Sequence, residues 1–206
     1  IFQEDKVSRA LIDKDAIYSA EGNASITSSL QVIGQIVAYA GEYGISTNPE
    51  SFAVYGNRKY FTDKKRGVVL RLSGGAGGGQ GITEISSYGM HDFFRDELAD
   101  ATKVVGGWNS HTKDYVLSLQ TSSDYKTATF DEGVLGWTSF SSYKPSHIFS
   151  LSNVFYTFNQ DVDINGNLGR LYQHYLGPYA KFYGVTYGSD VTIVLNSQPS
   201  VVKNFK

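Results

Sequence analysis

The stretch DVDINGNLG, residues 161–169, carries oxygen-bearing side chains at a spacing that could bind a metal ion. Asp161, Asp163 and Asn165 stand at alternate positions before Gly166, as in the first half of a calcium-binding loop. The second half departs from that pattern, because the bidentate glutamate is missing. The alternative is a hairpin tip, since Asp, Asn and Gly tolerate left-handed turns. Calcium is thus the one cofactor that the sequence indicates.

Side chains that could catalyse hydrolysis do not form a recognisable constellation. The four histidines are scattered without an HExxH motif, and no GxSxG motif occurs. A glycosidase needs two carboxylates facing across a cleft, and the adjacent pairs Asp96/Glu97 and Asp131/Glu132 are candidates for it. Neighbours in sequence point apart on a strand, which favours helix-surface and turn positions instead. We therefore predict no catalytic residue and no enzyme.

Aromatic residues cluster in the stretches GWTSFSSYKP (136–145) and YLGPYAKFYGVTYG (175–188). Exposed rings of this kind could stack on sugars or anchor a protein interface. The alternative is that they fill the wedge between the blades of a β-propeller. The sequence thus indicates four aromatic residues as candidates for binding: Trp137, Tyr143, Tyr179 and Tyr183.

A glycine run interrupts RLSGGAGGGQGITEIS, residues 71–86. A phosphate-binding loop needs a following helix, and its Walker form also needs Lys before Ser or Thr. Here the following ITEIS alternates as a strand does. Residues 74–81 are therefore predicted to be a glycine-rich surface loop or linker.

Composition predicts one all-β domain over residues 1–206. Aromatic residues make up 14% of the chain and 22 residues are glycine, which favours strands and turns. A net charge of −2 argues against binding nucleic acid through bulk electrostatics. The absence of cysteine excludes disulfides, and the apolar runs are too short to cross a membrane. Because the chain begins at Ile1 rather than Met, we expect it to be a fragment of something longer.

The elements that position these residues follow a repeated hairpin pattern. Apolar runs flank polar turns over residues 58–73, 104–120 and 153–175. Their turns begin 46 and 50 residues apart, close to the roughly 40–50 residues of a propeller blade. The pattern favours β-propeller-like blades of antiparallel strands, with a β-sandwich as the alternative. Helical periodicity in residues 89–101 predicts one short helix across a blade junction.

Several stretches together resemble large virion structural proteins of tailed bacteriophages, including marine cyanophages and crAss-like phages. The resemblance covers most of the chain, in order and spacing. The stretches are NPES (48–51), KYFTDKKRGVVLRLS (59–73), GITEISSYGMHDFFRD (81–96), GWTSFSSYKP (136–145), LYQHY (171–175) and FYGVTYGSDVTIVLNSQPSVVKNF (182–205).

This resemblance implies a scaffold associated with the tail or neck of the virion, with no catalytic residues. Its expected partners are other virion proteins and copies of itself, in a homo-oligomer, without nucleic acid or membrane. It also implies that the glycine run is a local insertion or replacement and that the chain continues on both sides. The alternative is a tail module that binds a glycan or receptor on the host surface through the aromatic candidates.

Overall fold

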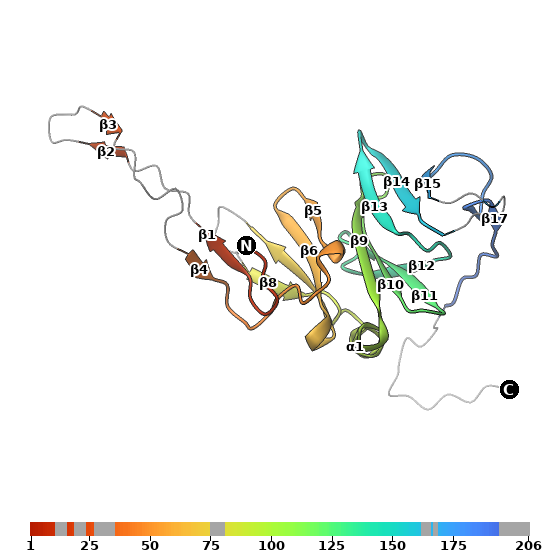
Figure 1. Ribbon diagram of the computed structural model, residues 1–206, viewed down its shortest axis with the longest axis horizontal. Helices are drawn as coiled ribbons and strands as arrows, with labels where there is room; N and C mark the ends of the chain where they lie inside the picture. The colour runs from red at the N-terminus through yellow and green to blue at the C-terminus, as the bar shows by residue number, and fades with distance from the viewer. Residues whose placement is uncertain are drawn as a thin grey trace.

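The computed structural model describes residues 1–10, 16–18, 24–26, 36–74, 81–161, 166 and 169–193. Within these ranges the chain forms mainly antiparallel strands, with one α-helix, α1 (His91–Asp100). The predicted all-β class is confirmed. Figure 1 shows the three main sheets following one another in chain order along the long axis of the molecule.

Each main sheet is a meander of strands that are consecutive in sequence. The first sheet contains β5 (Ala53–Tyr55), β6 (Arg58–Asp63), β7 (Val68–Ser73) and β8 (Gly81–Glu84). The second contains β9 (Lys103–Asn109), β10 (Asp114–Gln120), β11 (Tyr125–Asp131) and β12 (Gly136–Ser141). The third contains β13 (His147–Leu151), β14 (Val154–Asn159) and β15 (Arg170–Gln173).

Short elements complete the described structure. Two-stranded pairs are formed by β1 (Ser8–Ala10) with β4 (Ile36–Ala38), β2 (Ala16–Tyr18) with β3 (Ala24–Ile26), and β16 (Lys181–Phe182) with β17 (Val185–Thr186). The 3-10 helices are η1 (Pro49–Ser51) and η2 (Lys64–Arg66).

The three predicted hairpins are present as β6–β7, β9–β10 and β14–β15. In the first, the Asp63 carboxylate accepts a hydrogen bond from the backbone N–H of Arg66 at 3.2 Å, and Gly67 takes the left-handed conformation at φ 67°. Asp63 is fully buried and also accepts from Gly44 N–H at 3.0 Å and from the Ser46 hydroxyl at 2.8 Å. The described residues before η1, 1–10, 16–18, 24–26 and 36–48, are called the N-terminal segment here. The Asp63 carboxylate therefore joins this segment to the hairpin turn.

Strand alternation gives the second sheet two different faces. Along β10, Tyr115 and Leu117 enter the core shared with the first sheet, whereas Val116 lies in the core shared with the third. The core between the first and second sheets, which we call the first core, is the largest of the three cores in the described residues. Its buried members are Ala53, Tyr60, Val69, Ile85, Phe94, Leu98, Ala101, Val104, Trp108, Tyr115, Leu117, Leu119, Ala128 and Phe130.

Two smaller cores lie on either side of the first. One lies under the N-terminal segment, on the far face of the first sheet, and contains Val7, Ile45, Phe61, Val68, Leu70 and Leu72. The other, the third core, lies between the second and third sheets and contains Val105, Val116, Tyr143, Ile148 and Phe155. The layers are thus the N-terminal segment, then the first, second and third sheets.

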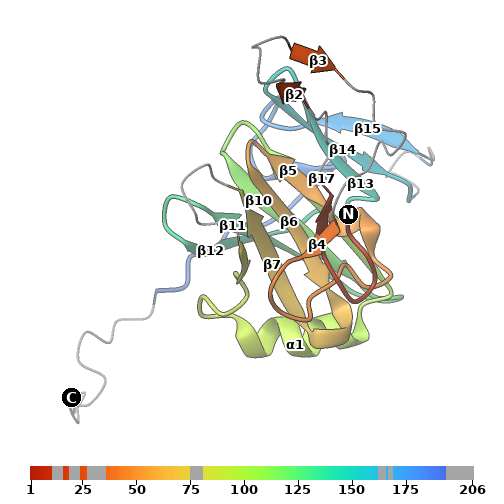
Figure 2. The ribbon, with the colours of Figure 1, turned by 90° about the vertical axis from the view of Figure 1, so that its left-hand side faces the viewer.

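Helix α1 confirms the helix predicted over residues 89–101. Phe94 and Leu98, one turn apart, are fully buried in the first core. Glu97 forms an ion pair with Lys126 of β11. Figure 2 shows the helix running below the ends of the sheets, so it covers the junction between the first and the second.

Two adjacent glycines in β9 allow close packing on both faces of the second sheet. A Cβ atom on Gly106 would overlap the carbonyl oxygen of Ser51 in η1, and one on Gly107 would overlap the side chain of Ile148 in β13. The Tyr115 hydroxyl donates to the same Ser51 carbonyl at 2.7 Å. The spacing of the layers therefore depends on these glycines.

The arrangement fits propeller blades and a sandwich in different respects. The first two sheets have four consecutive strands each, as blades do, and the sheets pack face to face, as in a sandwich. The described residues form an open row of sheets in Figure 1 rather than a closed ring. The propeller therefore stays a prediction, and the sandwich alternative remains compatible.

Most of the glycine run, residues 75–80, lies outside the described residues. Its two ends are fixed, because Ser73 pairs with Gly81 across β7 and β8, and Gly74 N–H donates to the Asn57 carbonyl at 3.1 Å. The element that follows is a strand, so the strand–loop–helix order of a phosphate-binding loop does not occur here.

Candidate binding site

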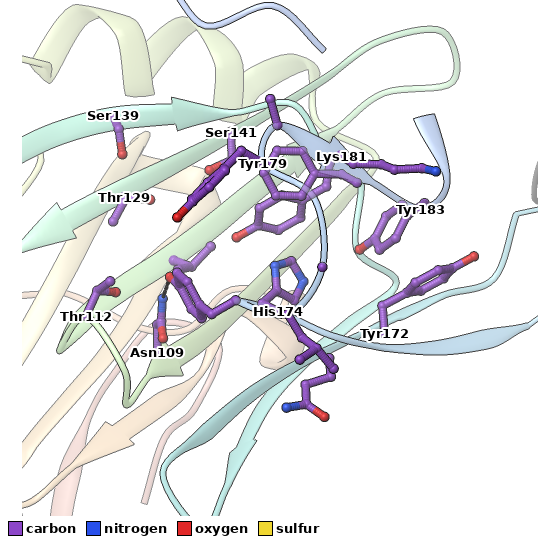
Figure 3. A pocket seen from close by; sticks show the side chains of 18 of the residues that line it. Asn109, Thr112, Thr129, Ser139, Ser141, Tyr172, His174, Tyr179, Lys181 and Tyr183 are labelled. Carbon is purple, nitrogen blue, oxygen red and sulfur yellow. Dashed lines mark hydrogen bonds between the residues drawn. The ribbon is translucent and has the colours of Figure 1, made fainter. Parts of the chain in front are cut away.

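A cavity of about 470 Å³ lies between the second and third sheets, beside the third core. Figure 3 shows residues of the second sheet on one side and the segment 172–183 on the other. Small-molecule sites commonly measure about 300–1,000 Å³. Three of the four aromatic binding candidates, Tyr143, Tyr179 and Tyr183, line this cavity.

The sheet side of the cavity is polar, because strand alternation directs small polar residues to this face. Asn109 pairs with Asp114 across β9 and β10, and Thr129 pairs with Ser139 across β11 and β12. Hydroxyl, amide and carboxyl groups thus lie together. The polar lining residues from this sheet and its turns are Asn109, Thr112, Asp114, Thr129, Ser139 and Ser141.

The opposite side is aromatic and packs around Tyr143, which follows β12 and is buried at 5% exposure. Its ring centroid lies 4.8 Å from that of His174 and 5.2 Å from that of Phe182. Burial raises the pKa of Tyr143 and of Tyr183, so both phenols are neutral at physiological pH. The aromatic side therefore offers ring faces and neutral hydroxyls.

A shared hydroxyl orients two of these rings. Thr157 Oγ1 on β14 lies 2.7 Å from His174 Nε2 and 2.7 Å from the Tyr183 hydroxyl oxygen. Burial lowers the pKa of His174 to about 4, so its imidazole is neutral at pH 7. The three side chains form an uncharged network behind the cavity.

Among the described residues, Asp114 is the one acidic side chain that lines the cavity, and it is 8% exposed. Burial raises its pKa, and the neighbouring charge of Asp131 raises it further, while hydrogen bonding to Thr112 opposes the shift. Among the described residues no partner accepts from or donates to its Oδ1 atom. A buried oxygen without a partner is costly, unless a ligand or water satisfies it.

The rim near β9 is held by side-chain contacts with the segment that follows β15. The Tyr175 ring stacks on His111 with centroids 4.1 Å apart, and its hydroxyl accepts from Asn109 Nδ2 at 2.6 Å. Positive φ angles occur at Tyr175, Ala180 and Tyr183, at 62°, 54° and 51°. Non-glycine residues rarely adopt this conformation, and such strain is often found at binding sites.

Trp137, the fourth aromatic candidate, lies elsewhere. Its ring packs on Phe94 and Phe130 at centroid distances of 4.4 and 5.3 Å, against the first core. Its Nε1 donates to the Ile85 carbonyl at 3.0 Å. Trp137 is therefore a half-buried residue that packs against the first core, away from the cavity.

The predicted calcium loop is described only in part. Asp161 accepts from Lys144 Nζ at 3.2 Å, whereas Asp163 and Asn165 lie outside the described residues. In the described part of the chain, no three His, Asp or Glu side chains gather where they could hold a metal ion. Calcium binding stays a prediction.

The two adjacent carboxylate pairs lie on α1 and at the β11–β12 turn, where the sequence places them. Each has a partner within the protein, and none lines the cavity. For Asp96, Glu97, Asp131 and Glu132 the partners are, in order, Arg95, Lys126, the backbone N–H of Gly133, and Arg71.

A scan against protein-family models and a search of curated proteins found no match for this chain. Among the described residues, no helix has the length and apolar character needed to span a bilayer. The cavity is therefore interpreted from its own chemistry.

Sequence reasoning missed the polar side of the cavity and His174. The available signal was the alternation in DYVLSLQ, where Asp114 and Ser118 fall on the same face as Val116. A strand whose two faces are both buried, one of them polar, indicates a site rather than an exposed surface. No pattern in the neighbouring sequence marked His174, because the residues that surround it come from distant parts of the chain, such as Tyr143 and Thr157.

Proposed function

We propose that this protein is a structural component of a tailed-bacteriophage virion, located at the tail or neck. There it would contact other virion proteins and copies of itself. The sequence resemblance supports this proposal, and the structural observation that carries it is an apolar face at the end of the stack of sheets.

This outer face belongs to the third sheet and faces away from the third core. The register pairs Phe149 with Tyr156 and Leu151 with Val154, so these side chains share one face. Phe149, Leu151 and Leu171 are 37%, 65% and 57% exposed. The apolar residues of this face, which we call the outer face, are Phe149, Leu151, Val154, Tyr156, Phe158 and Leu171, and the polar His147 and Gln173 lie beside them.

The corresponding faces of the other sheets are covered. The N-terminal segment covers the far face of the first sheet, and the second sheet lies between two cores. Soluble monomers rarely expose a large contiguous apolar patch, and such a patch commonly marks a protein interface. A permanent contact between subunits of a particle fits an interface of this composition.

The proposal is tested on purified particles of the phage that encodes this chain. Mass spectrometry should detect the chain in virions, and a cryo-EM map should place it in repeated copies at the tail or neck. A chain that is absent from purified particles would contradict the proposal.

The outer face is tested separately by sedimentation of the 206-residue chain. We expect concentration-dependent self-association that Leu151→Lys and Leu171→Lys abolish. Val134→Lys is the matched control, because Val134 is 70% exposed at the β11–β12 turn and outside this face. Self-association that is the same in all three variants would remove the outer face from the proposal.

A further inference from the structure

We propose that the cavity between the second and third sheets binds a neutral saccharide. The inference goes beyond the proposed structural role and does not depend on it. It is carried by the opposition of an aromatic side and a polar side across one cavity.

The two sides of the cavity match the two kinds of surface on a sugar ring. A pyranose presents C–H groups on one face, which pack on aromatic rings, and hydroxyls around its edge. Tyr179 is 99% exposed and stands at the cavity without burying its ring in the protein, so the face of the ring is available to a ligand. Tyr143 and Tyr183 supply ring surface deeper inside.

The polar side can satisfy the hydroxyls of such a ligand. Thr129, Ser139 and Ser141 offer hydroxyls that both donate and accept. Asp114 adds a carboxyl group whose Oδ1 has no partner among the described residues. That oxygen is enclosed by the protein, so a sugar hydroxyl would donate to the other oxygen of the carboxyl group, at the cavity wall.

The charges around the cavity favour a neutral ligand. Its titratable lining side chains, apart from tyrosines, are Asp114, His174 and Lys181. His174 is uncharged at pH 7, and Lys181 is an exposed residue at the start of β16. An anionic ligand would face the Asp114 carboxyl with one lysine to offset it, and a purely apolar ligand would bury several hydroxyls without partners.

The test is saturation-transfer NMR and calorimetry on the 206-residue chain with defined probes. The neutral probes are glucose, galactose, mannose, N-acetylglucosamine, maltose, cellobiose and lactose. Glucose 6-phosphate and adenosine serve as a charged sugar and as an aromatic ligand. Oligosaccharides released from the host surface form a separate arm, which distinguishes a surface glycan from free sugars.

Three variants localise the binding. Ser139→Ala and Tyr179→Ala change exposed side chains at the cavity, so they should leave folding intact. Tyr88→Ala is the matched control, because Tyr88 is an exposed tyrosine on the loop before α1, outside the cavity. Asp114→Asn preserves the shape of the side chain and removes its charge.

We expect saturable binding of at least one neutral sugar or host oligosaccharide. Ser139→Ala and Asp114→Asn should weaken binding by about tenfold each, as loss of one hydrogen bond to the ligand does, and Tyr179→Ala should weaken it several-fold. Tyr88→Ala should bind as the wild type does. The proposal is overturned if no neutral sugar in either arm binds saturably, if only adenosine or glucose 6-phosphate binds, or if neutral-sugar binding survives both Ser139→Ala and Tyr179→Ala.

Discussion

A buried charge cluster joins the first sheet to the second, and removing its centre should destabilise the protein strongly. The Glu132 side chain is 9% exposed and lies at the turn between β11 and β12. Its Oε2 accepts from Arg71 Nη1 at 2.6 Å, and its Oε1 accepts from the Tyr60 hydroxyl at 2.6 Å. Arg58 lies farther away, at 3.5 Å, and is 44% exposed.

The magnitude follows from which partners would be left buried. Arg71 is 14% exposed and its Nε already has no partner among the described residues. Loss of one member of a buried ion pair typically costs about 3–5 kcal/mol, whereas the exposed Arg58 contact adds at most about 1 kcal/mol. We expect Glu132→Ala to lose about 3–5 kcal/mol of unfolding free energy. Glu132→Gln should lose about 2–3 kcal/mol, because its amide oxygen still accepts from Tyr60.

The assay is urea denaturation followed by tryptophan fluorescence. Trp108 and Trp137 both pack at the first core, so their emission reports on the interface that Glu132 joins. Glu42→Gln is the control, since Glu42 is exposed and a surface change should stay within about 0.5 kcal/mol. The difference between the variants should persist in high salt, because buried pairs are screened weakly.

A double-mutant cycle identifies the partner. Glu132→Gln combined with Arg71→Gln should destabilise by clearly less than the sum of the single changes, because the second change removes the charge that the first left unpaired. A Glu132→Gln protein as stable as the Glu42→Gln control, or strictly additive effects in the cycle, would refute this account of the sheet interface.

Two further predictions concern His174, which packs on the third core, and Gly106, which packs against η1. The pKa of His174 is lowered from 6.5 to about 4, so the unfolded chain binds a proton that the folded chain does not. The unfolding free energy that depends on keeping this imidazole neutral, at most about 3 kcal/mol, is fully present above pH 6.5. It is lost as the pH falls toward 4. Urea titrations should show a shallower pH dependence for His174→Gln, and equal slopes would contradict this. Gly106→Ala should lose more than about 2 kcal/mol, because its Cβ would overlap the backbone carbonyl of Ser51, whereas Gly136→Ala meets no atom within 4 Å and should be nearly neutral in the same assay.

The sequence predicted local structure well where the signal was itself local. Turn residues and alternating apolar runs located the hairpins, and a helical period located α1. The order of the layers was not predictable in this way. It depends on contacts such as Tyr60 with Glu132, which are 72 residues apart and leave no trace in a short window.

The aromatic candidates illustrate the same limit at the site. Tyr143 and Trp137 lie in one stretch of sequence, yet they belong to different cores. Within β12 and the residues after it, one position faces the first sheet and another faces the third. Composition indicated that aromatic residues would cluster, but the packing of the second sheet between two cores decides which ring lies at the cavity.

The two proposed sites, the outer face and the cavity, lie on opposite sides of the third sheet. They can therefore be tested separately. Leu151 lies on the outer face, whereas Thr157, which orients His174 and Tyr183 behind the cavity, lies on the inner one. Leu151→Lys should therefore abolish self-association and leave sugar binding unchanged. Ser139→Ala, on the second sheet, should weaken sugar binding and leave self-association unchanged. If either change altered both measurements equally, the two faces would not act independently, and the assignment of separate roles to them would be wrong.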